Sequence, residues 1–145
     1  LGRHGRRSAG PGLAHGPVPT LKAGRLLHIW LPPALFMALL YLASATDDLP
    51  TVPHFSDKLM HLLAYTVLGL LFLRAFHGGI PAGLRLLPST AAVLATGTYG
   101  ALDEFHQGFV AGRVSDPRDF AADLLGALLA VLLLALWVRF FRGRP

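Results

Sequence analysis

The chain contains no cysteine among its 145 residues, so several kinds of chemistry are excluded at once. Disulfide bonds, thiolate metal sites, cysteine nucleophiles and acylated thiols all require the missing side chain. Charged residues are also scarce, at 14% of the chain, whereas a soluble domain typically carries about 25%. Hydrophobic residues reach 53%, and the mean hydropathy is +0.52. A water-soluble fold of this composition would have too little polar surface to cover itself, so the composition indicates a membrane protein.

The net charge of +5 does not indicate nucleic-acid binding, because of where the basic residues lie. They flank apolar stretches instead of forming a stripe, and basic flanks are typical of membrane topology signals. We therefore expect no nucleic-acid partner, and the partner that the composition indicates is the lipid bilayer.

Four apolar segments follow residues 1–20, which are rich in Gly, Pro and Arg and are predicted to form a disordered basic tail. Each segment is close to the about 20 residues that cross a bilayer core. Short connections rich in Gly, Pro and Asp predict antiparallel neighbours. The expected fold class is all-α, a polytopic membrane bundle of about four transmembrane helices within residues 21–142. The expected spans are residues 26–45, 58–76, 87–108 and 118–140.

Two helix starts are marked by capping residues. Ser56 is predicted to cap the second helix, and Asp57 follows in its first turn, where the helix dipole favours an acid. Asp116 before Pro117 predicts the start of the fourth helix. The motif Ala43-Ser44-Ala45 leaves signal-peptidase cleavage open, but the apolar run before it is longer than a signal peptide's usual about 7–15 residues, which favours a retained anchor.

Charge predicts the orientation of the bundle. With four spans, both termini and the loop at 77–85 share one side, which collects most of the basic residues, whereas the other side has only Lys58, Arg113 and Arg118. The positive-inside rule then places both termini in the cytoplasm. All acidic residues lie toward the opposite face: Asp47, Asp48, Asp57, Asp103, Glu104, Asp116, Asp119 and Asp123.

Several polar residues are expected at one depth below this face. Asp57, His61 and Tyr65 are spaced four residues apart and form a ladder down one face of the second helix. Asp103 and Gln107 share a face near the end of the third helix. Because an ionisable residue inside a span costs a few kcal/mol, such groups normally face the bundle and have partners. The residues expected to incur this cost are His61, Asp103, Glu104 and Asp123.

Two interpretations of this set stay open. A polar pocket in the outer third of the bundle explains why the residues share one level. Alternatively, they are interhelical contacts worth about 0.6 kcal/mol each, and Gly69 and Gly126 only permit close helix packing.

The motifs in this region resemble the signature of the VanZ-like family of bacterial membrane proteins. They are DKLMHLLAY (57–65), DEFHQ (103–107), GR (112–113) and DFAADLLG (119–126). The resemblance implies a multi-spanning protein of the bacterial cell envelope, in the cytoplasmic (inner) membrane. The family takes its name from a member associated with low-level resistance to the glycopeptide antibiotic teicoplanin, which binds cell-wall precursors.

The resemblance carries a set of residues over to this chain, with one departure. Asp123 stands where Asn is more often expected, and a buried carboxylate there needs a partner such as Arg113 or His61, or must stay protonated. The matched residues are Asp57, Lys58, His61, Tyr65, Asp103, Glu104, Gln107, Arg113, Asp119, Asp123 and Gly126.

The first functional hypothesis is a catalytic or substrate-binding site at the outer leaflet, acting on a lipid-linked or cell-wall intermediate. His61 would carry the proton, oriented by Asp57. Asp103 and Glu104 would form a second acid/base or metal-binding pair, although adjacent residues on a helix point about 100° apart. Lys58 and Arg113 would hold a phosphate or carboxylate. The remaining predicted substrate-binding residues are Tyr65, Gln107, Asp119 and Asp123.

The alternatives belong to other classes of function. A structural or accessory membrane protein could alter the access of lipophilic glycopeptides to the envelope or bind another membrane protein. A transporter is less favoured, because four spans are few and no interrupted helix pair marks a midplane site. A divalent metal is chemically compatible with His and carboxylates, but no recognised ligand spacing is present, so no metal and no cofactor are predicted.

Overall fold

The computed structural model describes residues 23–46 and 56–142, and in this part the helices are joined by loops, without strands. The all-α fold class predicted from the sequence is therefore confirmed. The predicted disordered tail and the acids Asp47 and Asp48 lie outside the described residues. The elements are α1 (Ala23–Ser44), α2 (Asp57–Phe76), α3 (Leu86–Gln107), α4 (Pro117–Trp137) and a short π-helical continuation, η1 (Val138–Arg142).

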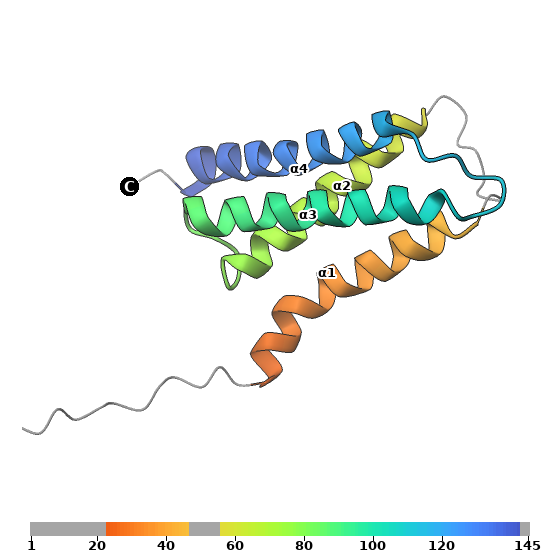
Figure 1. The fold of residues 1–145 in the computed structure, drawn as a ribbon. Coiled ribbons are helices and arrows are strands. Elements are labelled where there is room, and N and C mark those ends of the chain that lie inside the picture. Colours follow the sequence, from red (N-terminus) through yellow and green to blue (C-terminus); the bar gives the residue numbers. More distant parts are fainter. Residues whose placement is uncertain (1–22, 47–55, 143–145) are drawn as a thin grey trace, which may run out of the picture.

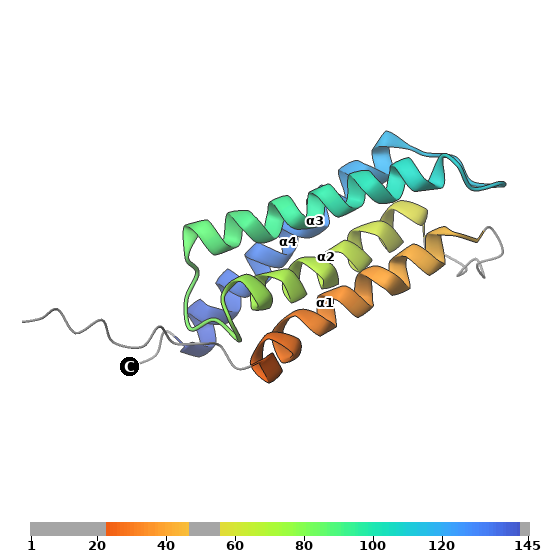
Figure 2. The same ribbon diagram turned by 60° about the horizontal axis from the view of Figure 1, so that its bottom comes forward.

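The four helices lie side by side and alternate in direction (Figures 1 and 2). The start of α1, the α2–α3 loop and the end of α4 lie at one end. The end of α1, the start of α2 and the α3–α4 loop (108–116) lie at the other end, which we call the acidic end. Helix α2 packs most extensively against α4, whereas α1 packs against α2 and α3 only. The core is thus formed by α2, α3 and α4, with α1 at its edge.

Three helical segments are long and apolar enough to cross a membrane: Ala23–Ser44, Asp57–Phe76 and Pro117–Phe141. Helix α3 is as long, at 22 residues, but it carries more polar residues and glycines. It nevertheless lies alongside the other helices through the bundle (Figure 2). The length and apolar character of these helices confirm the predicted polytopic membrane bundle.

The outer surface of the bundle is strongly apolar. Leucines that would face water in a soluble protein are largely exposed on α1 and α4, and such a continuous surface needs lipid or protein to cover it. The most exposed of them on these two helices are Leu27, Leu35, Leu39, Leu42, Leu125, Leu128 and Leu132.

Glycines set the short distance between α2 and α4. A Cβ atom added at Gly126 would lie 2.6 Å from the carbonyl oxygen of Leu62 and 2.9 Å from the backbone nitrogen of Thr66. A Cβ atom at Gly69 would lie 2.8 Å from the Cβ of Ala130. The predicted role of these two glycines in close helix packing is therefore confirmed.

Helix α1 contains two prolines, whose missing N–H groups leave carbonyls without an intrahelical donor. Pro32 and Pro33 remove the hydrogen bonds that His28 and Ile29 would accept. The guanidinium of Arg74 on α2 donates to these same two carbonyl oxygens, at 3.1 Å and 3.3 Å. A side chain of α2 thereby supplies the hydrogen bonds that the backbone of α1 lacks at the two prolines.

The two predicted helix caps are confirmed. The Ser56 hydroxyl accepts a hydrogen bond from the backbone N–H of Leu59 at 3.2 Å, at the start of α2. The Asp116 carboxylate accepts one from the backbone N–H of Arg118 at 2.9 Å, and Pro117 opens α4. Both helices therefore begin where the sequence predicts.

The close approach at Gly126 predicts a large effect of a single methyl group. We expect Gly126→Ala to lower the free energy of unfolding by about 1–3 kcal/mol, because the backbone of α2 must move away. Unfolding in mixed detergent micelles measures this change. The matched control is Gly24→Ala on α1, where an added Cβ meets nothing within 4 Å. That variant should be neutral or more stable by up to about 1 kcal/mol, and equal losses in both variants would contradict the packing argument.

Candidate functional site

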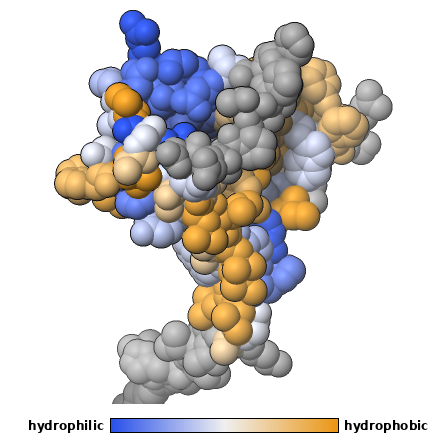
Figure 3. Space-filling model, turned by 90° about the vertical axis from the view of Figure 1, so that its right-hand side faces the viewer, coloured by the Kyte–Doolittle hydropathy of each residue, from blue (hydrophilic) through white to orange (hydrophobic). Residues whose placement is uncertain are grey.

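The acidic end carries an open cleft of about 410 Å³ between the start of α2, the end of α3 and the α3–α4 loop. Figure 3 looks onto this end, where hydrophilic side chains (blue) gather beside a hydrophobic column (orange). The cleft is lined by Asp57, Lys58, Gln107, Gly112, Arg113, Val114, Ser115, Asp116, Pro117 and Asp119. Five of the ten residues predicted for the site therefore line one cavity.

His61 does not line this cleft, but ligand atoms of Asp57 and Asp119, which do, lie within 4.8 Å of one of its nitrogens. Its Nδ1 is 2.9 Å from Oδ1 of Asp123, whose side chain is fully buried. The His61 side chain keeps 12% of its surface exposed. The sequence predicts that Asp57 orients this imidazole, but the hydrogen-bond partner is Asp123 on α4, which is one of the two partners expected for that carboxylate.

Glu104 connects α3 to the α3–α4 loop through one of its two oxygens. Oε2 accepts hydrogen bonds from the backbone N–H of Asp116 at 2.9 Å and from the hydroxyl of Ser115 at 3.2 Å. Oε1 is buried and has no hydrogen-bond partner within residues 23–46 and 56–142, and the same holds for Oδ2 of Asp123. Both side chains are more than nine-tenths buried, so each holds one carboxylate oxygen in a dry position without a donor.

Asp103 has a different environment, although it is adjacent to Glu104 in sequence. Its Oδ1 lies 2.5 Å from the hydroxyl of Ser44 on α1. Its Oδ2 accepts hydrogen bonds from Tyr65 on α2 at 3.2 Å and from Gln107 on α3 at 3.1 Å. Both oxygens are thus partnered, and one carboxylate joins three helices.

The two cations predicted to hold an anionic substrate are both engaged within the protein. The ammonium of Lys58 lies 3.0 Å from Oδ2 of Asp116 and 2.9 Å from Oδ1 of Asp119. Arg113 donates to the backbone carbonyls of Thr46 at 2.9 Å and Ala43 at 3.1 Å, so it fastens the α3–α4 loop to the end of α1. Both side chains still line the cleft, but their charge is partly satisfied before any ligand arrives.

Asp116 sits at the mouth of the cleft, outside the spans. The backbone N–H of Arg118 and the ammonium of Lys58 hold the pKa of the Asp116 carboxyl below its ordinary value. Its ionised form is therefore favoured, and the ion pair with Lys58 ties the start of α4 to the start of α2.

Two groups of side chains at this end place potential metal-ligand atoms within 4.8 Å of one another. One consists of Asp57, His61 and Asp119, and the other of His61, Glu104 and Asp123. The second is drawn from three different helices, which explains why no ligand spacing was visible along the chain.

Two contributors to the site were missed from the sequence. Gly100 lets Asp123 approach α3, because an added Cβ would lie 2.7 Å from its Oδ2. The position of Gly100 four residues before Glu104 was an available signal, since i and i+4 share a helix face. Ser44 was considered only as part of a cleavage motif, and nothing local to it indicates a bond to Asp103.

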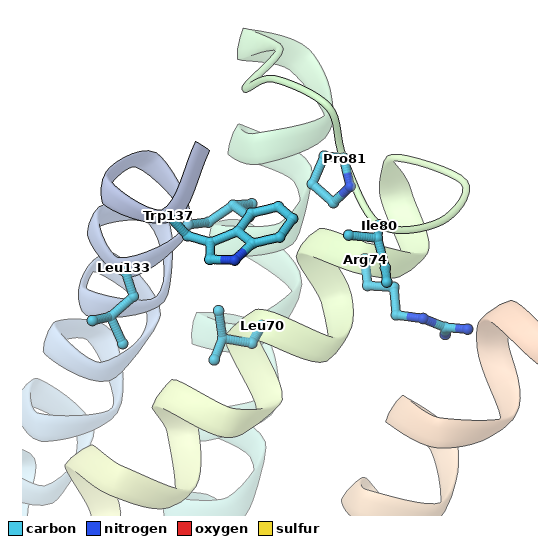
Figure 4. A pocket seen from close by; sticks show the side chains of 7 residues that line it. Leu70, Arg74, Ile80, Pro81, Leu133 and Trp137 are labelled. Carbon is cyan, nitrogen blue, oxygen red and sulfur yellow. The ribbon is translucent and has the colours of Figure 1, made fainter. Parts of the chain in front are cut away.

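A second cavity, of about 330 Å³, lies at the opposite end of the bundle and is apolar (Figure 4). Trp137 and Leu133 on α4 face Leu70 on α2, while Ile80 and Pro81 come from the α2–α3 loop. The charged end of Arg74 points away toward α1, where it donates to backbone carbonyls. This groove holds no proton-transfer chemistry, so the candidate site is the acidic end.

Comparison with known proteins supports the likeness seen in the motifs. Over 102 residues the chain is 32% identical to a protein of the fission yeast Schizosaccharomyces pombe named "Uncharacterized protein C11E3.10". The match covers 69% of this chain and 60% of the yeast protein, so it spans less than two thirds of that relative. No solved structure matches the chain. The sequence model of the VanZ/LLP1 family matches residues 22–138, which include all four helices up to the end of α4, and the chain therefore belongs to the VanZ/LLP1 family of membrane proteins.

Proposed function

We propose that the chain acts on the polar head group of a lipid-linked intermediate of the bacterial cell envelope, at a site that opens to the outer leaflet. His61 accepts or returns a proton, and Asp123 sets the orientation of its imidazole. The cleft that adjoins His61 receives the head group, and the apolar surface of the bundle leaves the lipid chain in the bilayer. Family membership supports a link to teicoplanin susceptibility, because that drug binds cell-wall precursors.

One observation carries this proposal. The imidazole of His61 keeps 12% of its surface exposed, while its Nδ1 lies 2.9 Å from a fully buried carboxylate. A histidine oriented by a buried acid, with its other nitrogen available, is the arrangement that general acid–base catalysis requires. Asp57 and Asp119, which line the cleft, place ligand atoms within 4.8 Å of the same imidazole, so His61 adjoins the space that would receive a substrate.

The internal contacts of Lys58 and Arg113 change which residues we propose for substrate binding. Since Lys58 and Arg113 are bound internally, the cleft is not a strongly cationic phosphate pocket. We infer that Gln107 and the backbone of the loop at 112–115 position the head group, and that charge on the substrate is compensated at His61. Lys58 and Arg113 then keep the cleft open by tying the loop and α4 to α1 and α2.

Topology can be tested directly, because the chain has no native cysteine. We expect Val114→Cys in the α3–α4 loop to react with a membrane-impermeant maleimide in intact cells. We expect Ile80→Cys in the α2–α3 loop to react only after permeabilisation. Both native side chains are highly exposed, at 82% and 66%, so accessibility of the reagent depends on the side of the membrane. The reverse labelling pattern would place the cleft in the cytoplasm and contradict the outer-leaflet site.

Function depends on His61 if the proposal is right. In a teicoplanin-susceptible bacterial host, the wild-type chain should change drug susceptibility and the profile of lipid-linked intermediates measured by mass spectrometry. His61→Gln should abolish both effects at equal membrane level, because glutamine cannot carry the proton. The matched control is Tyr99→Phe, which removes a buried hydrogen bond to the carbonyl of Met37, away from the cleft. An unchanged phenotype with His61→Gln would contradict a catalytic role.

A non-catalytic, accessory role is the second candidate, and the Asp103 network favours it. A carboxylate whose oxygens are all partnered by Ser44, Tyr65 and Gln107 serves as an interhelical contact. Under this role Asp103→Asn keeps function, because an amide can retain these contacts, and His61→Gln keeps it as well.

The structural role of this network predicts a measurable loss of stability. Tyr65→Phe should lower the free energy of unfolding by about 0.5–2 kcal/mol, because it removes a buried hydrogen bond to a carboxylate. The control is Thr66→Val, whose hydroxyl bonds only to the carbonyl of Leu62 in the same helix. Unfolding in mixed micelles should show a smaller change for Thr66→Val, and an equal or larger change would contradict the network's role.

A further inference from the structure

Apart from Oδ1 of Asp119, which lies 2.9 Å from the ammonium of Lys58, two buried carboxylate oxygens at the acidic end have no donor among the described residues. They are Oε1 of Glu104 and Oδ2 of Asp123, on side chains that are 6% and 0% exposed. Leaving a charged acceptor unpaired in a dry environment costs several kcal/mol, so each group requires a proton or a cation. The only lysine at this end in the described part of the chain, Lys58, already pairs with Asp116 and Asp119.

The side chains that carry these oxygens converge with His61. One ligand atom from each of His61, Glu104 and Asp123 lies within 4.8 Å of the others. The 2.9 Å separation of His61 Nδ1 and Asp123 Oδ1 is close to the about 3.0–3.4 Å that separates two ligands bound to one ion at about 2.1 Å each. The three side chains come from α2, α3 and α4, the tightly packed core of the bundle.

We propose that His61, Glu104 and Asp123 bind one divalent transition-metal ion, of the class of Zn²⁺ or Mn²⁺. A neutral imidazole with two carboxylates supplies a charge of −2, which a dication neutralises. Imidazole selects against Mg²⁺ and Ca²⁺, whereas two carboxylates favour harder ions than a thiolate site would. Three protein ligands leave a coordination position open, as in catalytic rather than structural zinc sites.

Supporting contacts and an entry path are both present. Glu104 is held from behind by the backbone N–H of Asp116 and the hydroxyl of Ser115, which fix its second oxygen. Gly100 lets the Asp123 carboxylate reach α3, since a Cβ there would lie 2.7 Å from Oδ2. The cleft that adjoins His61 provides the route from the membrane surface.

The neighbouring group of Asp57, His61 and Asp119 is the weaker candidate. Asp57 is exposed to solvent, and Asp119 lies 2.9 Å from the ammonium of Lys58. Water or a cation therefore compensates both of these carboxylates, whereas Glu104 and Asp123 each keep one buried oxygen without a donor among the described residues.

This inference rests on the proposed function and changes the role of His61 there from proton carrier to ligand: an ion that it holds would activate water or polarise a phosphoryl or carbonyl group of the same substrate. Ion binding and envelope phenotype are separate measurements, so the two can fail separately. If the chain binds the ion but His61→Gln has no envelope phenotype, the proposed function is contradicted and the metal site is not. If the envelope phenotype depends on His61 but no ion binds, the metal site is contradicted and the proposed function is not.

The test is metal binding to the full chain in lipid nanodiscs. After chelator treatment, the protein is titrated with Zn²⁺ and Mn²⁺ by calorimetry, and bound metal is counted by mass spectrometry. We expect one ion per chain. Electron spin-echo spectroscopy of the Mn²⁺ form should show coupling to an imidazole nitrogen, and this coupling should disappear in His61→Gln.

Glu104→Gln and Asp123→Asn should each weaken binding by more than the about 10–100-fold typical of supporting residues. The matched controls are Asp103→Asn, which alters a fully partnered carboxylate adjacent to Glu104, and Tyr99→Phe, and both should still bind one ion. Absence of stoichiometric binding would overturn the proposal. So would loss of binding in Asp103→Asn equal to that in Glu104→Gln, or dependence on Asp57 and Asp119 instead of Glu104 and Asp123.

Discussion

The structure depends on how carboxylates are accommodated in an apolar helical bundle. Each must find donors, a cation or a proton, because desolvation of an unpaired charge costs more than a small membrane domain can offset. Asp103 meets this requirement with neutral donors from three helices. Glu104 and Asp123 meet it only on one oxygen each. Asp103 therefore serves as a packing contact between helices, whereas Glu104 and Asp123 belong to the candidate reactive centre.

The geometry of that centre rests on backbone proximity between helices. Asp123 can bond to His61 because α4 approaches α2 closely at Gly126, where no side chain intervenes. Gly100 does the same between α3 and α4. Three helices thus meet at glycine positions within a few residues of the acids, so the tight packing and the polar site have one common cause.

Much of the fold follows from the sequence because its signals are local. Hydropathy predicts four apolar helices, and Ser56 and Asp116 mark two starts through caps that involve only their own next turn. The gathering of polar residues at one face was also predictable. Because neighbouring helices alternate in direction, the polar ends of α2, α3 and α4 lie at similar depths. The family motifs and the family match agree with this level of description.

Partner choice within the site could not be predicted, because it depends on how each helix is rotated. Periodicity alone makes Asp57 a partner for His61, yet packing turns the imidazole toward Asp123 instead. Arg113 and Lys58 appear free in the sequence but are used to hold backbone carbonyls and neighbouring acids. The grouping of His61, Glu104 and Asp123 spans three helices, so no spacing along the chain reports it.

The bond between Arg74 and the proline-containing helix has a consequence for biogenesis. Alone in a bilayer, α1 would expose the His28 and Ile29 carbonyls to hydrocarbon without a donor, and α2 would carry an arginine without a partner. The carbonyls of α1 and the guanidinium of Arg74 on α2 satisfy each other. Helices α1 and α2 are therefore suited to enter the bilayer together as a hairpin, because each supplies the hydrogen-bond partner that the other requires.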